Sequence, residues 1–244
     1  MNISKESIIG TIVAEDYRTA GVFEQAGIDF CCNGNRNIEV ACREQKIEAE
    51  ELVSLLQQTV DAPSRKEEGI SDYKLWPLDL LADYIEKKHH RYVNEQTPVI
   101  QAFLEKIVRV HGRRHPELAE IKAHFDACAG ELTAHMKKEE LMLFPFIRKM
   151  VQAKQEDSKE IVAPFGTVQN PIRMMMHEHD TEGERFRRIK ELSSQYTVPE
   201  DGCSTYKAAY QNLQAFEDDL HLHIHLENNI LFPRCIVLEQ SFAR

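Results

Sequence analysis

The chain has 244 residues, of which 42% are hydrophobic and 29% charged, and its formal net charge is −10 at pH 7. These proportions are typical of a soluble globular protein that needs no disulfide staples. The acidic balance argues against non-specific nucleic-acid binding, which requires Lys and Arg to neutralise phosphates. No apolar run approaches the roughly 20 residues that span a bilayer, and no signal-peptide pattern opens the chain. We therefore expect a cytoplasmic protein that does not bind membranes.

Helix-forming residues dominate throughout, there are only 10 glycines, and the alternating pattern of β-strands is absent. The sequence therefore predicts an all-α protein. Residues 1–60 carry short apolar stripes and are expected to form a small helical N-terminal domain. The polar segment 61–75 contains Pro63 and Gly69 and has the composition of a linker.

Residues 76–244 are predicted to form an up-down four-helix bundle, because four long helical patterns are joined by short connections. Pro98 is expected to kink the first helix, and Pro145 and Pro233 to kink or end the second and the fourth. The four helices are expected at 77–111, 116–150, 165–195 and 203–235.

The pattern H-x-x-x-E-x-x-x-L-F-P occurs twice in this second domain, beginning at His135 and again at His223. A further histidine precedes each copy, His90 by 45 residues and His179 by 44. Such a period indicates a duplicated pair of helices, and positions i and i+4 of a helix share one face. Six side chains are therefore expected to converge in the bundle core as metal ligands: His90, His135, Glu139, His179, His223 and Glu227.

The histidine and glutamate of each copy also fall on the apolar stripe of their helix. An ionised carboxylate there must be paired or bind a metal, because burying it alone costs several kcal/mol. An ordinary His–Glu contact explains one such motif but not two in register. The stripes are Cys128, Leu132, His135, Glu139 and Met142 in the second helix, Ile172, Met175, Met176, His179 and Phe186 in the third, and Leu213, Phe216, Leu220, His223, Glu227 and Ile230 in the fourth.

The first helix leaves two candidates open. The stripe of Leu78, Leu81 and Ile85 continues to His89, whereas the repeat spacing favours His90. We take His90 as the ligand and keep His89 as the alternative. The remaining histidines are interpreted as solvated or as neighbours that support the ligands without binding metal: His111, His115, His124, His177, His221 and His225.

The ligand types narrow the choice of metal. Nitrogen and carboxylate donors without thiolate suit iron, manganese or zinc, and six ligands are more than one tetrahedral zinc uses. Two ions that share the carboxylates fit better. Iron is our choice, because an open binuclear site suits oxygen, peroxide or nitric oxide chemistry.

Two motifs resemble a known family. The set His90, His135-x-x-x-Glu139, His179-Asp180 and His223-x-x-x-Glu227-Asn228-Asn229 resembles the hemerythrin-like domain. The turn Gly-Ile-Asp-Phe-Cys-Cys, which ends at Cys31 and Cys32, resembles the small domain that precedes it in the iron–sulfur cluster repair di-iron proteins, the RIC family. The combination is specific, and together the two motifs cover nearly the whole chain.

The resemblance implies roles for these residues. The four histidines would be terminal ligands of two iron ions, and Glu139 and Glu227 would bridge the ions together with an oxo or hydroxo group. The family acts under nitrosative and oxidative stress and restores iron–sulfur clusters damaged by nitric oxide or peroxide, plausibly by supplying iron. Its members are cytoplasmic proteins. Damaged iron–sulfur proteins are the expected partners, and a homodimer is the expected assembly.

The N-terminal turn departs from the family pattern at one position, where Asn33 stands in place of glycine. Asn tolerates a left-handed backbone better than most residues, so we expect the turn to persist. Cys31 and Cys32 either pack the turn or form a redox or metal-transfer pair. The scattered cysteines do not resemble an extracellular disulfide framework and are interpreted as structural: Cys42, Cys128, Cys203 and Cys235.

Three functions share these ligands. The leading hypothesis is cluster repair by iron donation rather than by turnover. The second is an enzyme that reduces nitric oxide or peroxide at the di-iron centre, and the third is an oxygen or redox sensor. Sustained consumption of substrate with a reductant would separate the enzyme from a stoichiometric donor.

Overall fold

The computed structural model describes residues 1–62, 73–158 and 161–242. Helices account for the regular structure of these residues, which contain no β-strand and only an isolated bridge between Ile8 and Asn37. The all-α prediction is confirmed. Most of the predicted linker at 61–75 lies outside the described residues; Asp61 ends a helix, and Tyr73–Leu75 form a 3-10 turn.

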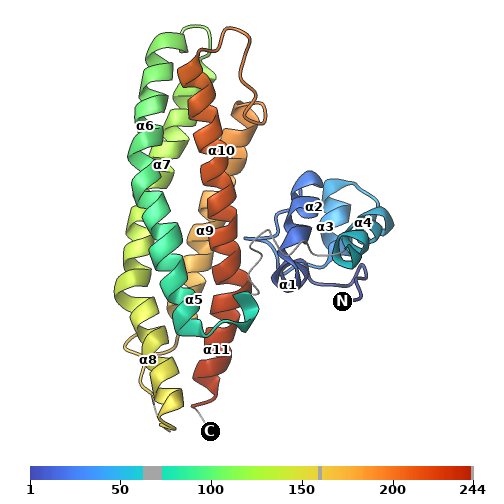
Figure 1. Ribbon diagram of the computed structural model, residues 1–244, viewed down its shortest axis with the longest axis vertical. Coiled ribbons are helices and arrows are strands. Elements are labelled where there is room, and N and C mark those ends of the chain that lie inside the picture. Colours follow the sequence, from blue (N-terminus) through green and yellow to red (C-terminus); the bar gives the residue numbers. More distant parts are fainter. Residues whose placement is uncertain (63–72, 159–160, 243–244) are drawn as a thin grey trace.

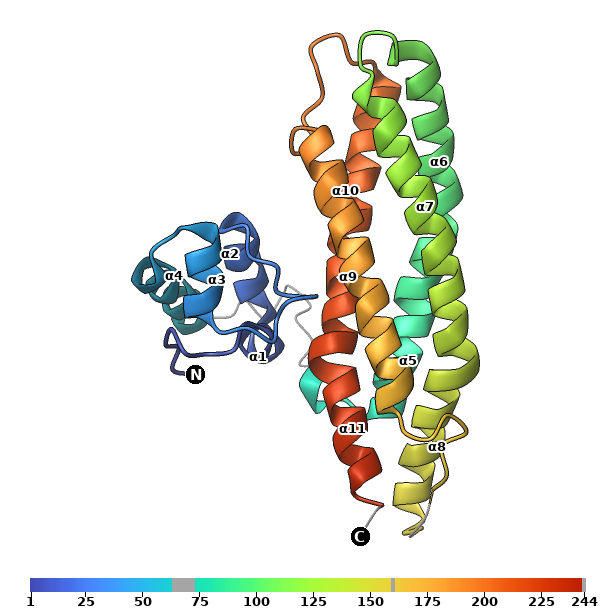
Figure 2. The same ribbon diagram turned by 180° about the vertical axis from the view of Figure 1, so that it is seen from behind.

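A small helical unit forms the N-terminal part of the chain, beside the long bundle in Figures 1 and 2. Asn37 begins its third helix, where its side chain accepts a hydrogen bond from the backbone N–H of Val40 and so caps the helix. Lys46, in the left-handed conformation, ends that helix. The helices of this unit are α1 (Ile9–Glu15), α2 (Ala20–Gln25), α3 (Ile38–Gln45) and α4 (Ala49–Asp61), with a 3-10 turn at Tyr17–Thr19.

Four long helical rods form the bundle, and three of them contain a π-helical segment between two α-helices. The third rod is the single helix α9 (Gln169–Leu192). The other three are α5 (Leu78–Tyr84), η3 (Ile85–His90) and α6 (Arg91–His111); α7 (Glu117–Lys138), η4 (Glu139–Leu143) and α8 (Phe144–Gln155); and α10 (Ser204–His225), η5 (Leu226–Leu231) and α11 (Phe232–Gln240).

The sequence suggested that the prolines of the two L-F-P motifs kink or end their helices. The structure shows that they do not end them. Helical structure continues to Gln155 after Pro145 and to Gln240 after Pro233. Proline lacks an N–H and clashes with the carbonyl four residues back. A π-helical turn precedes each proline and changes the hydrogen-bonding register: the N–H of Phe144 donates to the Glu139 carbonyl, and that of Phe232 to the Glu227 carbonyl.

The same π-helical turn overturns one predicted core position. Met142 was expected on the buried stripe of the second helix, but 51% of it is exposed, and its neighbour Leu143 is buried instead. A π turn adds one residue to the local period, so the apolar face moves one position along the chain. A stripe drawn at strict α-helical spacing therefore fails after Glu139.

The bundle core has two apolar parts, and the predicted metal ligands lie between them. Along the second rod, Leu132 belongs to one hydrophobic cluster and Leu143 to the other. Along the fourth rod, Leu220 and Ile230 mark the same division. A polar layer therefore interrupts the core, and its four backbone rods are held in place by apolar packing on both sides.

The N-terminal unit packs against the bundle at the π-helical turn of the fourth rod, where α1 contacts η5. The contact is close: a Cβ atom added to Gly10 would lie 2.3 Å from Asn229 Oδ1. Asn229 also donates a hydrogen bond through Nδ2 to the Phe30 carbonyl, at 3.1 Å. The segment that holds Cys31 and Cys32 is thereby held against the bundle (Figure 2).

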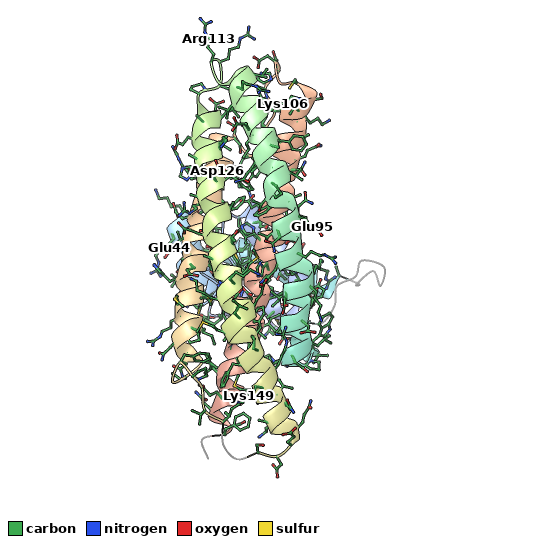
Figure 3. The ribbon with its side chains drawn as sticks, turned by 90° about the vertical axis from the view of Figure 1, so that its left-hand side faces the viewer. Glu44, Glu95, Lys106, Arg113, Asp126 and Lys149 are labelled. Atoms are coloured by element: carbon green, nitrogen blue, oxygen red, sulfur yellow. The ribbon has the colours of Figure 1, made fainter. Side chains whose placement is uncertain are left out.

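Charged side chains such as Glu95, Lys106, Arg113 and Lys149 line the outside of the bundle in Figure 3. Among the described residues, none of the helices combines the length and the apolar character that a membrane span requires.

Candidate metal centre

The structure brings together all six residues that the sequence singled out. They form two groups of four, within each of which one potential ligand atom per residue lies within 4.8 Å of the others. One group contains His90 and His223, the other contains His135 and His179, and both contain Glu139 and Glu227. The arrangement therefore provides two neighbouring metal positions that share two carboxylates.

Each shared carboxylate lies between histidines from different rods. Glu139 Oε2 is 3.3 Å from His90 Nε2 and 3.4 Å from His135 Nε2. Glu227 Oε2 is 3.1 Å from His179 Nε2, and Glu227 Oε1 is 3.2 Å from His223 Nε2. A carboxylate in this position can bridge two ions, as in other bundle proteins whose metal sites face inward.

The buried polar atoms of the cluster fit a metal. All six side chains are buried, with Glu139 and Glu227 fully inaccessible. Within the described part of the chain, both oxygens of Glu139, Oε2 of Glu227 and Nε2 of His90 form no hydrogen bond. Unsatisfied buried carboxylates are costly in an apolar core, and coordination of cations removes that cost.

The pKa values describe how the metal-free cluster holds its charge. Burial opposes ionisation of Glu227, but His223 and His179 outweigh it and hold the pKa of Glu227 well below its usual range. Burial likewise disfavours protonated His135, but the negative charges of Glu139 and Glu227 raise its pKa to about 10. Metal ligation requires a neutral imidazole, so a metal ion must displace this proton.

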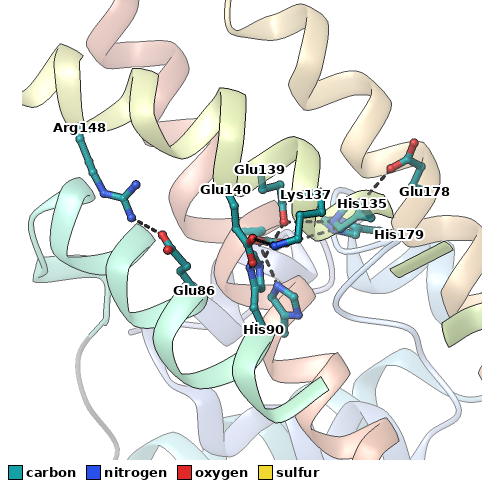
Figure 4. Close-up of polar contacts among 11 residues, drawn as sticks. Glu86, His90, His135, Lys137, Glu139, Glu140, Arg148, Glu178 and His179 are labelled. Carbon is teal, nitrogen blue, oxygen red and sulfur yellow. Dashed lines mark hydrogen bonds and ion pairs between the residues drawn. The ribbon is translucent and has the colours of Figure 1, made fainter. Parts of the chain in front are cut away.

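Three of the four histidines are oriented by a second partner at Nδ1. His90 donates to Glu140 at 3.1 Å and His135 donates to Glu178 at 2.8 Å (Figure 4). His179 donates to the Asn228 side chain at 2.9 Å. Such partners fix the ring orientation of a ligand and strengthen it as a donor.

His223 differs from the other histidines of the cluster. Its Nδ1 has no hydrogen-bond partner among the described residues, and its ring stacks on His89 at a centroid distance of 5.5 Å. Sequence reasoning did not identify Glu140, Glu178 or Asn228 as partners of the ligands. Their spacing gives no signal, since each contacts a histidine from a different rod.

The structure also separates the two candidates of the first helix. His90 faces Glu139, whereas the Nδ1 of His89 faces Asp219 on α10, 3.0 Å from either carboxylate oxygen. Both histidines are buried. The π-helical segment Ile85–His90 explains the conflict in the sequence: a five-residue step from Ile85 reaches His90, where a four-residue step reaches His89.

The Cys31–Cys32 turn lies against the ligand His179. Asn228 connects the two, since its Nδ2 donates to the Cys31 carbonyl at 3.1 Å. The Cys32 thiol donates to the His179 carbonyl at 3.4 Å. Gly183 favours this approach, because a Cβ atom there would lie 3.1 Å from Cys32 Sγ and the thiol would have to shift. The turn therefore touches one half of the cluster from outside the bundle.

Asn33 keeps the turn intact by a route that the sequence did not suggest. It does not adopt a left-handed backbone conformation. Its side chain instead donates to Asp29 at 2.8 Å, and Asp29 also accepts from the backbone N–H groups of Cys31 and Cys32. The sulfur atoms of the two cysteines are 3.7 Å apart, and both thiols are free.

Two other interpretations from the sequence need correction. His225 is buried rather than solvated, and its ring packs against Tyr17 and Phe30 of the N-terminal unit. Cys203 is exposed at the N-terminus of α10. His111 lies 3.3 Å from its sulfur, and this contact is the main reason that the pKa of the Cys203 thiol falls to about 7.

The fold and the site define a four-helix-bundle metal protein of the hemerythrin type. Residues 81–235 match the hemerythrin HHE cation binding domain, and residues 5–60 match a domain of unknown function, DUF542.

Over most of its length the chain is also similar to curated proteins. It is 29% identical to the iron-sulfur cluster repair protein ScdA of Staphylococcus haemolyticus over 95% of this chain and 99% of that protein. It is 32% identical to the iron-sulfur cluster repair proteins YtfE of Yersinia pestis and Yersinia pseudotuberculosis, over 93% of this chain and 96% of each relative. The chain therefore belongs to the family of iron–sulfur cluster repair proteins with a hemerythrin-like domain, as its motifs predicted.

Proposed function

We propose that this protein repairs iron–sulfur clusters damaged by nitrosative or oxidative stress and that it does so with two iron ions held in the bundle. The observation that carries the proposal is the pair of overlapping ligand groups that share Glu139 and Glu227. The names of its relatives support the repair function. Oxygen and nitrogen ligands without a thiolate suit iron, manganese or zinc, and the family resemblance favours iron among them.

In this proposal, each residue of the cluster has a defined task. The histidines would hold one ion in each half, and the two glutamates would contribute to both positions and neutralise part of the charge. A bound iron pair would supply redox chemistry and would be a source of transferable iron. Because His135 is protonated in the metal-free state, loading and release of iron are linked to proton exchange.

A reconstitution experiment tests the repair function. A dehydratase whose iron–sulfur cluster has been inactivated by nitric oxide is incubated with the iron-loaded protein, and the return of its activity is measured. We expect recovery with the wild type and none beyond background with the Glu227→Gln variant. Free ferrous iron at the same concentration is the control, and a known iron donor is the positive standard. Recovery no greater than with free iron would contradict the proposal.

The second candidate function is reduction of nitric oxide or peroxide at the same centre. It is favoured by one observation: a cavity of about 240 Å³ opens beside the ligands His135 and His179 and gives small molecules room near the cluster. Stopped-flow measurements with excess reductant separate the two functions. Sustained consumption indicates an enzyme, and a single stoichiometric reaction indicates a donor.

As partners we propose proteins with damaged iron–sulfur clusters, and as the assembly a dimer of two copies of this chain. The family resemblance supports both. Light scattering of the purified protein measures the assembly directly.

A further inference from the structure

A cavity between α7 and α9 leads from the surface to one half of the metal centre. Its volume is about 240 Å³, which is room for several water molecules at roughly 30 Å³ each. The ligands His135 and His179 form part of its wall. The other lining residues come from the same two helices: Glu131, Leu132, Ala134, Lys138, Glu178 and Glu182.

Glu182 is the unusual member of this wall. It lies three residues after His179 on α9, and only 2% of it is exposed. Neither of its carboxylate oxygens has a hydrogen-bond partner in the described part of the chain. Arg185 forms an ion pair with Glu182, with 3.4 Å between Nε and Oε1, but no hydrogen bond. A small-molecule ligand in the cavity can supply the missing partner.

The other charges around Glu182 are already paired. On α7, Glu131 is bound by Arg185 from α9, and Lys138 is bound by Glu178. His135, which faces the cavity from α7, donates to Glu178. The buried Cys128 thiol also faces Glu182 from α7 but carries no charge at neutral pH. Glu182 therefore shares the charge of Arg185 with Glu131, and a bound proton would neutralise it fully.

The environment of Glu182 favours the protonated form of its carboxyl group. Burial is the largest effect and raises the pKa of Glu182 to about 7, while Cys128 and Arg185 act in the opposite direction and Glu131 adds to the increase. An ordinary glutamate is ionised at that pH. Glu182 can therefore exchange a proton under physiological conditions, next to a site where small molecules approach the ligands.

We propose that Glu182 is a proton-linked ligand-binding group: in its neutral form it donates a hydrogen bond to a small anion that occupies this cavity beside the metal centre. Binding of the anion above neutral pH then requires uptake of one proton by Glu182, because an ionised carboxylate would repel the anion and offer no donor. The inference rests on the metal binding of the proposed function, since the anion's second contact is a metal ion held by His135 and His179.

Azide is a suitable probe, since it is a small anion that ligates ferric iron. Its dissociation constant for the iron-loaded, oxidised full-length protein is measured by absorption between pH 5.5 and 9. For the wild type we expect the constant to rise about tenfold per pH unit above pH 7, the slope for linkage to one proton. For Glu182→Gln we expect this slope to disappear, because an amide donates a hydrogen bond at every pH.

The control is Glu217→Gln. Glu217 is equally buried, on α10, but it is paired with Lys190 at 3.1 Å and lies outside the cavity. This variant should keep the slope of the wild type. If Glu182→Gln keeps it too, the proton comes from another source, such as water on the metal, and the inference is wrong.

Infrared spectroscopy of the metal-free protein provides an independent readout. The wild type should show the band of one neutral buried carboxyl group that disappears with a midpoint near pH 7, and Glu182→Gln should lack it. Absence of such a band from the wild type would overturn the inference. Because this measurement needs no metal, it separates failure of the inference from failure of the proposed repair function.

Discussion

The two halves of the metal centre have equivalent ligands but different surroundings. Each half offers two histidines and the two shared glutamates. In the half formed by His90 and His223, Glu140 accepts a hydrogen bond from His90, and His89 stacks on His223 and is held by Asp219. An open cavity of about 420 Å³ also reaches His90. In the half formed by His135 and His179, the additional features are a cavity with a buried glutamate and the contact with the N-terminal turn.

The difference between the two halves shows that a duplicated motif determines the positions of the ligands but not the groups around them. Duplication of a helix pair places equivalent ligands on opposite sides of a core. It does not place the groups around them, which come from other rods and from the N-terminal unit. Cavities reach a histidine of each half, so we expect the halves to differ through the Cys31–Cys32 turn and the buried Glu182, which both lie on the His135–His179 side.

The largest effect should come from the residues that belong to both halves. Glu139→Gln and Glu227→Gln should each remove most of the bound iron, because an amide neither bridges two ions nor neutralises their charge. The helical content should persist, since apolar packing on both sides of the cluster holds the rods. The melting temperature of the iron-loaded protein should fall, because iron at 100 times its dissociation constant adds about 2.7 kcal/mol. Metal analysis and circular dichroism measure these changes.

The control for this comparison must be chosen with care. Glu140 adjoins Glu139 but accepts a hydrogen bond from His90, so it is not neutral with respect to the site. Glu95 is exposed on α6 (Figure 3), where it pairs with Arg91 at 3.7 Å. If Glu95→Gln lost as much iron as the two bridging variants at equal helicity, the bridging roles would be wrong.

A smaller effect is expected when a single half is altered. His90→Ala should lose about one of two irons, because His90 faces Glu139 from the first rod. His89→Ala should retain both, because its Nδ1 faces Asp219 instead. Metal content and the optical spectrum of each variant provide the measurement. The reverse result would show that His89, and not its neighbour, is the ligand.

His89 and His90 also show how much of the site could be predicted from the sequence. The repeat predicted the all-α bundle and the six residues that meet in its core, because a fixed period and an i, i+4 spacing carry three-dimensional information. The stripe method failed at Met142, where a π-helical turn adds a residue, and it did not separate His89 from His90, which are both buried at another such turn. The π-helical turns after Glu139 and Glu227 could have been predicted from the proline that follows each glutamate at the same distance. The turn at Ile85–His90 has no such signal.

The residues that surround the six predicted ligands could not be predicted from the sequence. Glu140, Glu178 and Asn228 each contact a histidine that is more than 40 residues away in the chain. Glu182 appeared as one of 40 acidic residues, and only the packing of α7 against α9 shows that it is buried. Contacts of this kind depend on how the rods are rotated about their axes, and composition or periodicity does not fix that rotation.

The cavity half should also respond to pH in the absence of metal. The pKa of Glu182 is raised from 4.5 to about 7 by burial, so the folded protein holds this proton more tightly than the unfolded chain does. Its contribution to stability is present below about pH 4.5 and is lost as the pH rises to 7. The wild type should lose roughly 3 kcal/mol relative to Glu182→Gln across this window, at about 1.4 kcal/mol per unit. Urea unfolding of both metal-free proteins at a series of pH values measures the difference, and parallel curves would contradict it.

The smallest effect, and the sharpest comparison of the two halves, concerns the partners of the histidines. Glu140 orients His90 and pairs with Lys137, while Glu178 orients His135 and pairs with Lys138 (Figure 4). Replacing either glutamate by Gln removes a negative charge beside one ligand. A loss of about 10- to 100-fold in metal affinity is typical for such partners.

The two variants should nevertheless differ. After Glu178→Gln, the second histidine of that half, His179, is still oriented by Asn228. After Glu140→Gln, the second histidine of its half is His223, whose Nδ1 has no partner among the described residues. Neither Nδ1 of that half then keeps a native hydrogen-bond partner, so Glu140→Gln should weaken iron binding more than Glu178→Gln does. Competition with a chelator measures both affinities, and Asn228→Ala combined with Glu178→Gln should bring the second half down to the level of the first. Equal affinities in the two single variants would show that the Asn228 contact does not stabilise its half of the site.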